Sequence, residues 1–191
     1  MHGFLRSSSL RIGLILLASF VGGAGSSWAY SYSGYKWSGT SVTYYVDASL
    51  PAATVTAIKS SDATWDAAGS KFRFSYGGTK SVCDGTSQVF SYDGGSTGSV
   101  GVTSVYASGS TVTMIYTNLN SHYSLTVGGS ATSYDIQNTM THEFGHWLVL
   151  ADLYSAGSSS YTMYYTESKG ETKKRSLESD DKNGIKAIYG T

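Results

Sequence analysis

Two histidines four residues apart, with a glutamate between them, constrain this chain more than any other feature. They stand in the stretch THEFGH at residues 141–146. In a helix, residues four apart lie on one face one turn apart, so His142 and His146 can aim ring nitrogens at a single ion. The stretch therefore predicts a helix with one face that binds metal.

Glu143 follows the first histidine directly. It lies about 100° further around the helix by the 3.6-residue period, beside the ion rather than on it. A Zn²⁺ ion with three protein ligands keeps one position open, lowers the pKa of its bound water to about 7 and polarises a carbonyl group. A carboxylate at Glu143 can take the proton of that water, which predicts hydrolysis of a peptide bond with Glu143 as the general base.

The rest of the predicted helix supports this orientation. Ser133 is the predicted N-cap, and Asp135 is favourably placed at the positive end of the helix. Projected at about 100° per residue, the apolar side chains gather opposite the two histidines. These side chains are Ile136, Met140, Phe144, Trp147 and Leu148.

A third protein ligand has to come from outside the histidine pair, and Asp152 is the candidate. If the helix continued past His146, its rise of about 1.5 Å per residue would carry Asp152 about 9 Å further along, out of reach of the ion. The chain must therefore turn back between these two residues. A glutamate from later in the chain, Glu171 or Glu167, is the alternative third ligand.

The first 29 residues have the order of a secretory signal peptide. Arg6 and Arg11 precede an apolar run at residues 12–21, and the small residues Ser27 and Ala29 suit cleavage by signal peptidase. The run is about half of the roughly 20 residues that span a bilayer. We predict a signal peptide at residues 1–29, one domain at residues 30–191, and a secreted, extracellular protein without membrane attachment after cleavage.

Charge and cysteine content limit the expected partners. Without the two leader arginines, the 13 basic residues fall to 11 against 13 acidic ones, a net charge near −2. This excludes a basic field for nucleic acid or anionic lipid. The expected partner is a polypeptide substrate, and the expected state is a monomer. Cys83 is the only cysteine and is expected to be buried and inert, with a thiol that caps the zinc as the alternative.

The remaining chain predicts an α+β domain. A helix is expected at residues 52–68, after Pro51 and before Gly69, and another at 178–188. Polar loops are expected between the strands and before the motif helix. The expected fold is one mixed, twisted sheet with two main helices and a short C-terminal subdomain that carries the last helix. Strands are expected at 42–46, 71–76 (closed by Gly77 and Gly78), 88–92, 100–106 and 111–116.

The motif resembles that of the metzincin clan of zinc endopeptidases, and within it the matrixin-like secreted enzymes of microbes. In the clan, a glycine stands three residues after the second histidine, and a histidine or aspartate follows three residues later. Asp152 matches the last position, whereas Val149 stands where the glycine is expected. A β-branched residue resists a positive φ, so either the turn is made differently or the assignment of Asp152 weakens.

Two later stretches carry the same resemblance. Met163 is similar to the methionine of the clan's Met-turn, which forms an apolar floor beneath the metal. Residues 177–190 resemble the matrixin C-terminal helix, in which paired aspartates, here Asp180 and Asp181, tie the helix to the Met-turn and the mature N-terminus. Tyr165 matches a tyrosine that in some metzincins donates a hydrogen bond to the oxyanion.

The resemblance implies a metzincin-like zincin domain and a secreted zinc endopeptidase that cleaves extracellular proteins. In it, His142, His146 and Asp152 hold one catalytic Zn²⁺ and Glu143 activates the zinc-bound water. The alternative is a secreted binding protein or inactive homologue that keeps the zinc fold, favoured by Val149 and opposed by the intact Glu143. No second zinc site is expected, because His122 alone cannot form one; a structural Ca²⁺ is compatible with the resemblance, but no motif locates it.

Overall fold

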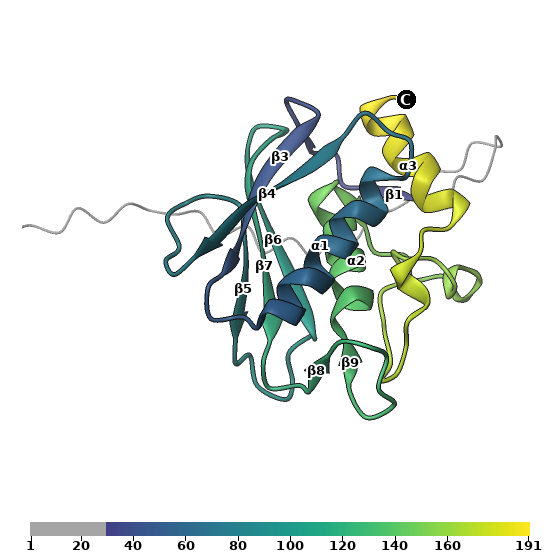
Figure 1. Ribbon diagram of the computed structural model, residues 1–191. Helices are drawn as coiled ribbons and strands as arrows, with labels where there is room; N and C mark the ends of the chain where they lie inside the picture. The colour runs from purple at the N-terminus through teal and green to yellow at the C-terminus, as the bar shows by residue number, and fades with distance from the viewer. Residues whose placement is uncertain (1–29) are drawn as a thin grey trace, which may run out of the picture.

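The structure is a computed structural model that describes residues 30–191. It has the expected α+β architecture, with a mixed and mostly parallel sheet, helices packed beside it and a C-terminal helix (Figure 1). The predicted signal peptide at residues 1–29 lies outside the described residues and stays a prediction. From residue 30 to residue 191, no helix is both long enough and apolar enough to cross a bilayer.

Within the described residues, the main sheet has six strands. Five of them, β2, β3, β4, β5 and β7, run parallel, and β6 pairs antiparallel with β7. In the part of the chain that the structure covers, β6 pairs with no other strand, so it presents one open edge. The strands are β2 (Lys36–Trp37), β3 (Ser41–Asp47), β4 (Arg73–Lys80), β5 (Gln88–Tyr92), β6 (Gly101–Ser108) and β7 (Thr111–Asn120).

Helices α1 (Ala52–Asp66) and α2 (Ile136–Trp147) lie side by side next to the sheet (Figure 1). Tyr44 of β3 connects the sheet to α2, because its ring contacts Phe144 with centroids 5.3 Å apart and Trp147 with centroids 6.0 Å apart. Such aromatic pairs add about 0.5–1.5 kcal/mol each beyond the burial of their area. On the other side, the Trp65 indole of α1 donates to the Thr141 carbonyl at 2.7 Å. The motif helix is therefore held by both the sheet and α1.

The first described residues lie close to both the segment after α2 and the C-terminal helix. Strand β1 (Ser31–Tyr32) pairs antiparallel with β10 (Leu150–Ala151), immediately after the motif helix. Tyr30 packs across Gly184 of helix α3 (Ser179–Tyr189), where a Cβ atom would stand 2.9 Å from the Tyr30 ring. The remaining elements are β8 (Leu125–Thr126), β9 (Tyr134–Asp135) and two short 3₁₀ helices, η1 (Ala156–Ser158) and η2 (Lys173–Arg175).

Three local predictions are wrong. Strand β4 runs on through Gly77 and Gly78 because it continues to pair with β3 as far as Lys80, and the lack of a side chain at Gly77 leaves room for the Tyr45 ring, which would be 2.6 Å from a Cβ. Asp135 rather than Ser133 is the N-cap of α2, since its carboxylate accepts from the Asn138 amide at 2.9 Å. Cys83 is exposed instead of buried.

Candidate metal centre

Helix α2 presents His142 and His146 on one face, with ring centroids 4.8 Å apart. Nδ1 of His142 is 2.8 Å from the Thr162 carbonyl oxygen, and Nδ1 of His146 is 2.8 Å from the Leu150 carbonyl oxygen. A carbonyl only accepts, so each Nδ1 carries the proton and donates it. In the neutral tautomer this leaves the lone pair on Nε2, which is the arrangement that a metal-binding histidine needs.

The chain reverses at Val149, two residues after α2 ends. Val149 has φ +65°, and across residues 30–191 it is the one residue other than glycine with a positive φ. Its amide donates to the His146 carbonyl at 3.0 Å, and its carbonyl accepts from Ser33 at 3.0 Å. The strain of about 1–3 kcal/mol at such a residue is offset by burial of the side chain, which is 1% exposed and worth about 1.5–3 kcal/mol. The turn is therefore made at the valine itself.

This turn brings Asp152 back to the histidines. Asp152 Oδ1 lies 3.3 Å from His142 Nε2 and 3.5 Å from His146 Nε2, and the ligand atoms of the three residues all lie within 4.8 Å of one another. Oδ1 is buried and makes no hydrogen bond to any described residue. Buried polar atoms are normally paired, and a cation between these three atoms would satisfy all of them. Two imidazoles and one carboxylate with an open fourth position suit Zn²⁺.

The electrostatics of the three residues are strongly coupled before a cation binds. Burial by itself raises the pKa of Asp152, but the two histidines facing it hold that pKa far below its usual range. Burial lowers the pKa of His146, and this effect is outweighed by Asp152, Glu143 and the Leu150 carbonyl, which together raise the pKa to about 9. The site is therefore built to attract and hold positive charge.

Glu143 points toward strand β6 from the next position on α2. Its side chain is buried at 4% exposure, and Oε2 accepts a hydrogen bond from Thr103 Oγ1 at 2.6 Å. The three candidate ligands and this carboxylate are thus gathered at one end of α2. A metal held by the first three would have a carboxylate beside it, next to the open edge of the sheet.

A comparison with known families agrees with this geometry. Residues 36–190 match the family described as matrixin. The chain belongs to the matrixin family. Matrixins are zinc-dependent metalloendopeptidases, so the activity class of this matrixin is that of a metallopeptidase acting on polypeptides, and the inactive-homologue reading is not favoured. Among curated proteins, none matches the chain significantly.

The Met-turn of this matrixin packs directly against the metal-binding helix. Met163 is 2% exposed, and a Cβ at Gly145 would overlap its sulfur, so only glycine allows this approach between the two histidines. Asp181 of α3 holds the same turn, because its Oδ2 accepts from the Thr162 amide at 3.1 Å and from the Glu178 amide at 2.9 Å. Since Thr162 also carries the carbonyl that binds His142, α3 supports the metal centre indirectly.

The alternative ligands, Glu167 and Glu171, lie outside the histidine cluster. Glu167 accepts from Asn138 Nδ2 at 2.8 Å and from Thr139 Oγ1 at 2.9 Å, and Glu171 lies 3.3 Å from Lys173 Nζ. Among residues 30–191, the one group of His, Cys, Asp and Glu side chains close enough to share an ion is the cluster around Asp152. The geometry therefore favours Asp152 over either glutamate as the third ligand.

Two tyrosines stand beside Asp152. The Tyr154 hydroxyl is 3.5 Å from Asp152 Oδ2, and its ring stacks with Tyr165 at a centroid distance of 5.0 Å. Both rings are exposed, at 68% and 47%. Tyr165 is therefore in the neighbourhood of the metal centre, and its role as an oxyanion donor stays a prediction from the resemblance.

Sequence reasoning missed the polar residues that surround the cluster. Thr103 contacts Glu143 directly, and Thr117 contacts it through Thr103. Lys174 is 1% exposed, and its Nζ donates to the Tyr164 carbonyl at 2.5 Å. All three lie far from the motif in sequence. No sequence pattern marks Thr103, because alternation would place the apolar Val102 inward, whereas Val102 is the exposed neighbour in the structure.

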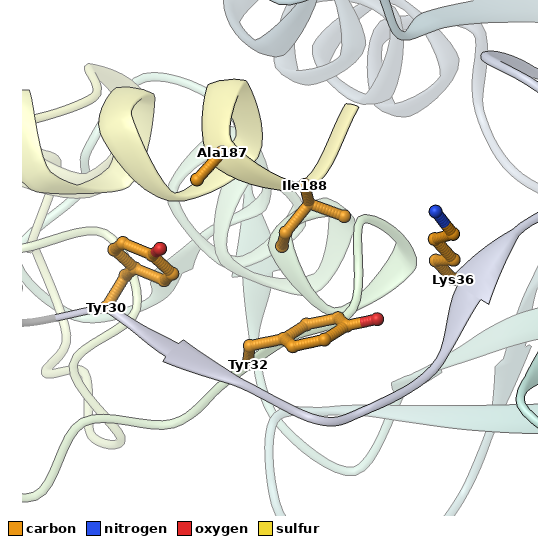
Figure 2. Close-up of a pocket in the computed structure, with 5 residues that line it drawn as sticks. All are labelled: Tyr30, Tyr32, Lys36, Ala187 and Ile188. Atoms are coloured by element: carbon orange, nitrogen blue, oxygen red, sulfur yellow. The ribbon is translucent and has the colours of Figure 1, made fainter. Parts of the chain in front are cut away.

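The hollow in Figure 2 lies away from this cluster. It has a volume of about 280 Å³ and sits between the N-terminal segment and α3. None of the predicted site residues lines this hollow, so it is a feature of the packing between the N-terminal segment and α3 rather than of the metal centre. Its lining residues are Tyr30, Tyr32, Lys36, Ala187 and Ile188.

Proposed function

We propose that this matrixin is a secreted zinc endopeptidase in which His142, His146 and Asp152 hold one Zn²⁺ and Glu143 is the general base and then the general acid. The observation that carries the proposal is the buried Oδ1 of Asp152, which makes no hydrogen bond within the described chain and faces Nε2 of both histidines. An inert scaffold has no need to gather these three atoms beside a carboxylate. The family match supports the same activity.

The chemistry divides between the ion and the protein. When bound, Zn²⁺ supplies Lewis-acid chemistry, which polarises the scissile carbonyl and makes water more acidic. Glu143 takes the proton of the attacking water on its carboxylate and returns it to the leaving amine nitrogen. The carbonyls of Thr162 and Leu150 keep the two imidazoles in the orientation that offers Nε2 to the ion.

The open edge of β6 is the proposed place for the substrate. Its partner strand is β7 alone within the described chain, and Thr103 of β6 contacts Glu143. An extended peptide that adds to this edge would receive main-chain hydrogen bonds while its scissile bond lies next to the carboxylate. The exposed rings of Tyr154 and Tyr165 stand on the Asp152 side, where they can contact apolar substrate side chains.

Secretion follows from the leader pattern at residues 1–29, which motivates an extracellular location and extracellular protein substrates. The near-neutral charge of the remaining chain gives no basic field for nucleic acid or anionic membrane surfaces, and the proposed state is a monomer. Mass spectrometry of the protein from the culture medium tests this: an N-terminus at Tyr30 is expected. Recovery of the protein only inside cells, with residues 1–29 retained, would contradict secretion.

The activity is tested by Glu143→Ala. We expect the variant to keep its zinc and to lose casein cleavage, because the proton acceptor is removed while the three ligands remain. Zinc is measured by metal analysis and cleavage by release of soluble peptides, with chelator inhibition of the parent protein as the positive control. Casein cleavage that persists in Glu143→Ala would refute the proposed function.

The ligand set is tested by comparing Asp152→Ala with Glu171→Ala. The first change removes an oxygen that faces both histidines, so zinc affinity should fall sharply. The second removes a carboxylate paired with Lys173 and should leave zinc affinity unchanged. The opposite pattern would move the third ligand to Glu171.

A further inference from the structure

A chain of three hydrogen bonds leads from the domain core to the carboxylate of Glu143. The Trp147 indole nitrogen donates to Thr117 Oγ1 at 2.8 Å. Thr117 Oγ1 lies 2.6 Å from Thr103 Oγ1, and Thr103 Oγ1 is 2.6 Å from Glu143 Oε2. The chain starts and ends on α2 and passes through β7 and β6, so it ties the motif helix to two strands.

The direction of these hydrogen bonds has one solution. An indole N–H only donates, an ionised carboxylate only accepts, and each threonine hydroxyl has a single proton. Trp147 therefore donates to Thr117, Thr117 donates to Thr103, and Thr103 donates to Glu143. Hydrogen bonds linked in this way polarise one another, so the bond to Glu143 is strengthened by the two before it.

Strand pairing keeps this arrangement in register, and most of it is buried. Thr103 and Thr117 are directly opposite each other in the β6–β7 pair. Trp147 and Thr117 are fully buried, and Glu143 is nearly so. Thr103 is half-buried at the edge of the sheet, so the protected part of the chain is the one that runs from Trp147 to Thr117.

Gly101 lies against the other oxygen of the same carboxylate. A Cβ at Gly101 would stand 2.6 Å from Glu143 Oε1 and 3.0 Å from Cδ. Strand β6 thus holds one oxygen through the Thr103 hydroxyl and leaves space for the other by having no side chain at Gly101. The contacts with β6 therefore fix the carboxylate through Oε2, with Oε1 against Gly101.

We propose that Thr103 is a positioning residue that holds Glu143 in the orientation needed for proton transfer, while Thr117 and Trp147 set the direction of its hydroxyl. This role rests on the proposed function, in which Glu143 accepts a proton from water. Thr103 acts through Glu143 and contacts none of the three candidate metal ligands closely enough to hydrogen bond within the described chain. Loss of its hydroxyl should therefore slow the chemical step without weakening metal or substrate binding.

The test compares Thr103→Val, which keeps the shape but removes the hydroxyl, with Thr103→Ser, which keeps the hydroxyl. We expect Thr103→Val to lower kcat for a peptide substrate by about 10–100-fold, the range seen when a residue that orients catalytic groups is lost. KM and zinc content should stay unchanged, and Thr103→Ser should restore most of kcat. Thr113→Val is the matched control on the same strand pair, since Thr113 Oγ1 donates to the Tyr106 carbonyl at 3.1 Å, and its kcat should not change.

Each outcome decides one question. An unchanged kcat in Thr103→Val, or a serine variant as slow as the valine variant, would overturn the positioning role. Glu143→Ala is assayed in parallel to separate failure of the positioning role from failure of the proposed function. Cleavage by Glu143→Ala refutes the proposed function. An inactive Glu143→Ala together with a fully active Thr103→Val refutes the positioning role alone. If Thr103→Val does not fold, as judged by circular dichroism, Thr103→Ala against Thr103→Ser decides in the same way.

Discussion

The charge on His146 gives a pH test of the metal centre that needs no substrate. The Asp152 carboxylate, Glu143 and the Leu150 carbonyl raise the pKa of His146 to about 9 in the absence of a cation. At pH 7 its ring is therefore almost fully protonated on both nitrogens. Since an ion needs the lone pair of Nε2, zinc must displace one proton to bind.

The size of the effect follows from the distance between pH and pKa. At pH 7, about 2 units below the pKa, the competing proton weakens the apparent zinc affinity about 100-fold, or about 2.7 kcal/mol. Raising the pH from 7 to 8 should therefore strengthen the apparent affinity about tenfold, and the gain should level off near pH 9. Apparent zinc affinity can only rise with pH over this range, because zinc competes with a proton for Nε2 of His146, whose pKa is raised.

The measurement uses protein stripped of metal by a chelator. Apparent zinc affinity is determined by competition with a chromophoric chelator at pH 7, 7.5 and 8, after correction for the chelator's own protonation. Calorimetry at pH 7 in two buffers of different ionisation enthalpy counts the proton released on binding. Asp152→Asn is the control in the metal-free protein: loss of the carboxylate removes a main cause of the raised pKa, so the pKa of His146, followed by NMR, should fall. A zinc affinity that does not change between pH 7 and 8, with no proton released, would refute the assigned charge state.

Two further predictions concern stability. Gly184→Val should lower the free energy of unfolding by about 1–3 kcal/mol, because the new side chain overlaps Tyr30 and Leu150. Gly157→Ala is the control: its Cβ meets nothing closer than 3.7 Å, so the free energy of unfolding should change by no more than about 0.5 kcal/mol. Urea unfolding measures both, and equal stabilities would count against the packing of Tyr30 on Gly184. Asp135→Ala should lower the free energy of unfolding by about 1–2 kcal/mol, because it removes the N-cap of α2 and leaves Arg175, 2.8 Å from the Asp135 carboxylate, without its partner. Thermal unfolding measures this, with Asp93→Ala at an exposed position as the control. An unchanged unfolding midpoint in Asp135→Ala would show that the cap contributes nothing.

The local part of the site could be predicted from the sequence. The positions of His142, Glu143 and His146 follow from the helical period, which depends on neighbouring residues alone. The order of strands and helices follows from runs of β-branched and apolar residues, and the main elements are confirmed within a few residues of their expected ends. Membership of the matrixin family confirms the resemblance that these motifs carry.

What could not be predicted depends on contacts between distant segments. Thr103 reaches Glu143 only because β6 pairs with β7 in a particular register and the sheet packs against α2, and neither distance in sequence nor composition encodes that. The conformation of Val149 is a second case. Its intrinsic preference argues against a positive φ, and the surrounding core overrides that preference.

The turn at Val149 also explains why the N-terminal segment belongs to the metal centre. Ser33 donates to the Val149 carbonyl, and Ser31 and Tyr32 pair with the two residues that follow the turn. These contacts hold the strained residue from the side opposite the helix, where a glycine would have needed no such support. Asp152 directly follows Ala151, the last residue of β10 that pairs with β1. Its distance from the histidines is therefore set by residues 31–33 as well as by the motif. The aspartate is therefore the ligand most sensitive to changes outside the motif, and the histidines, carried by α2, are the least.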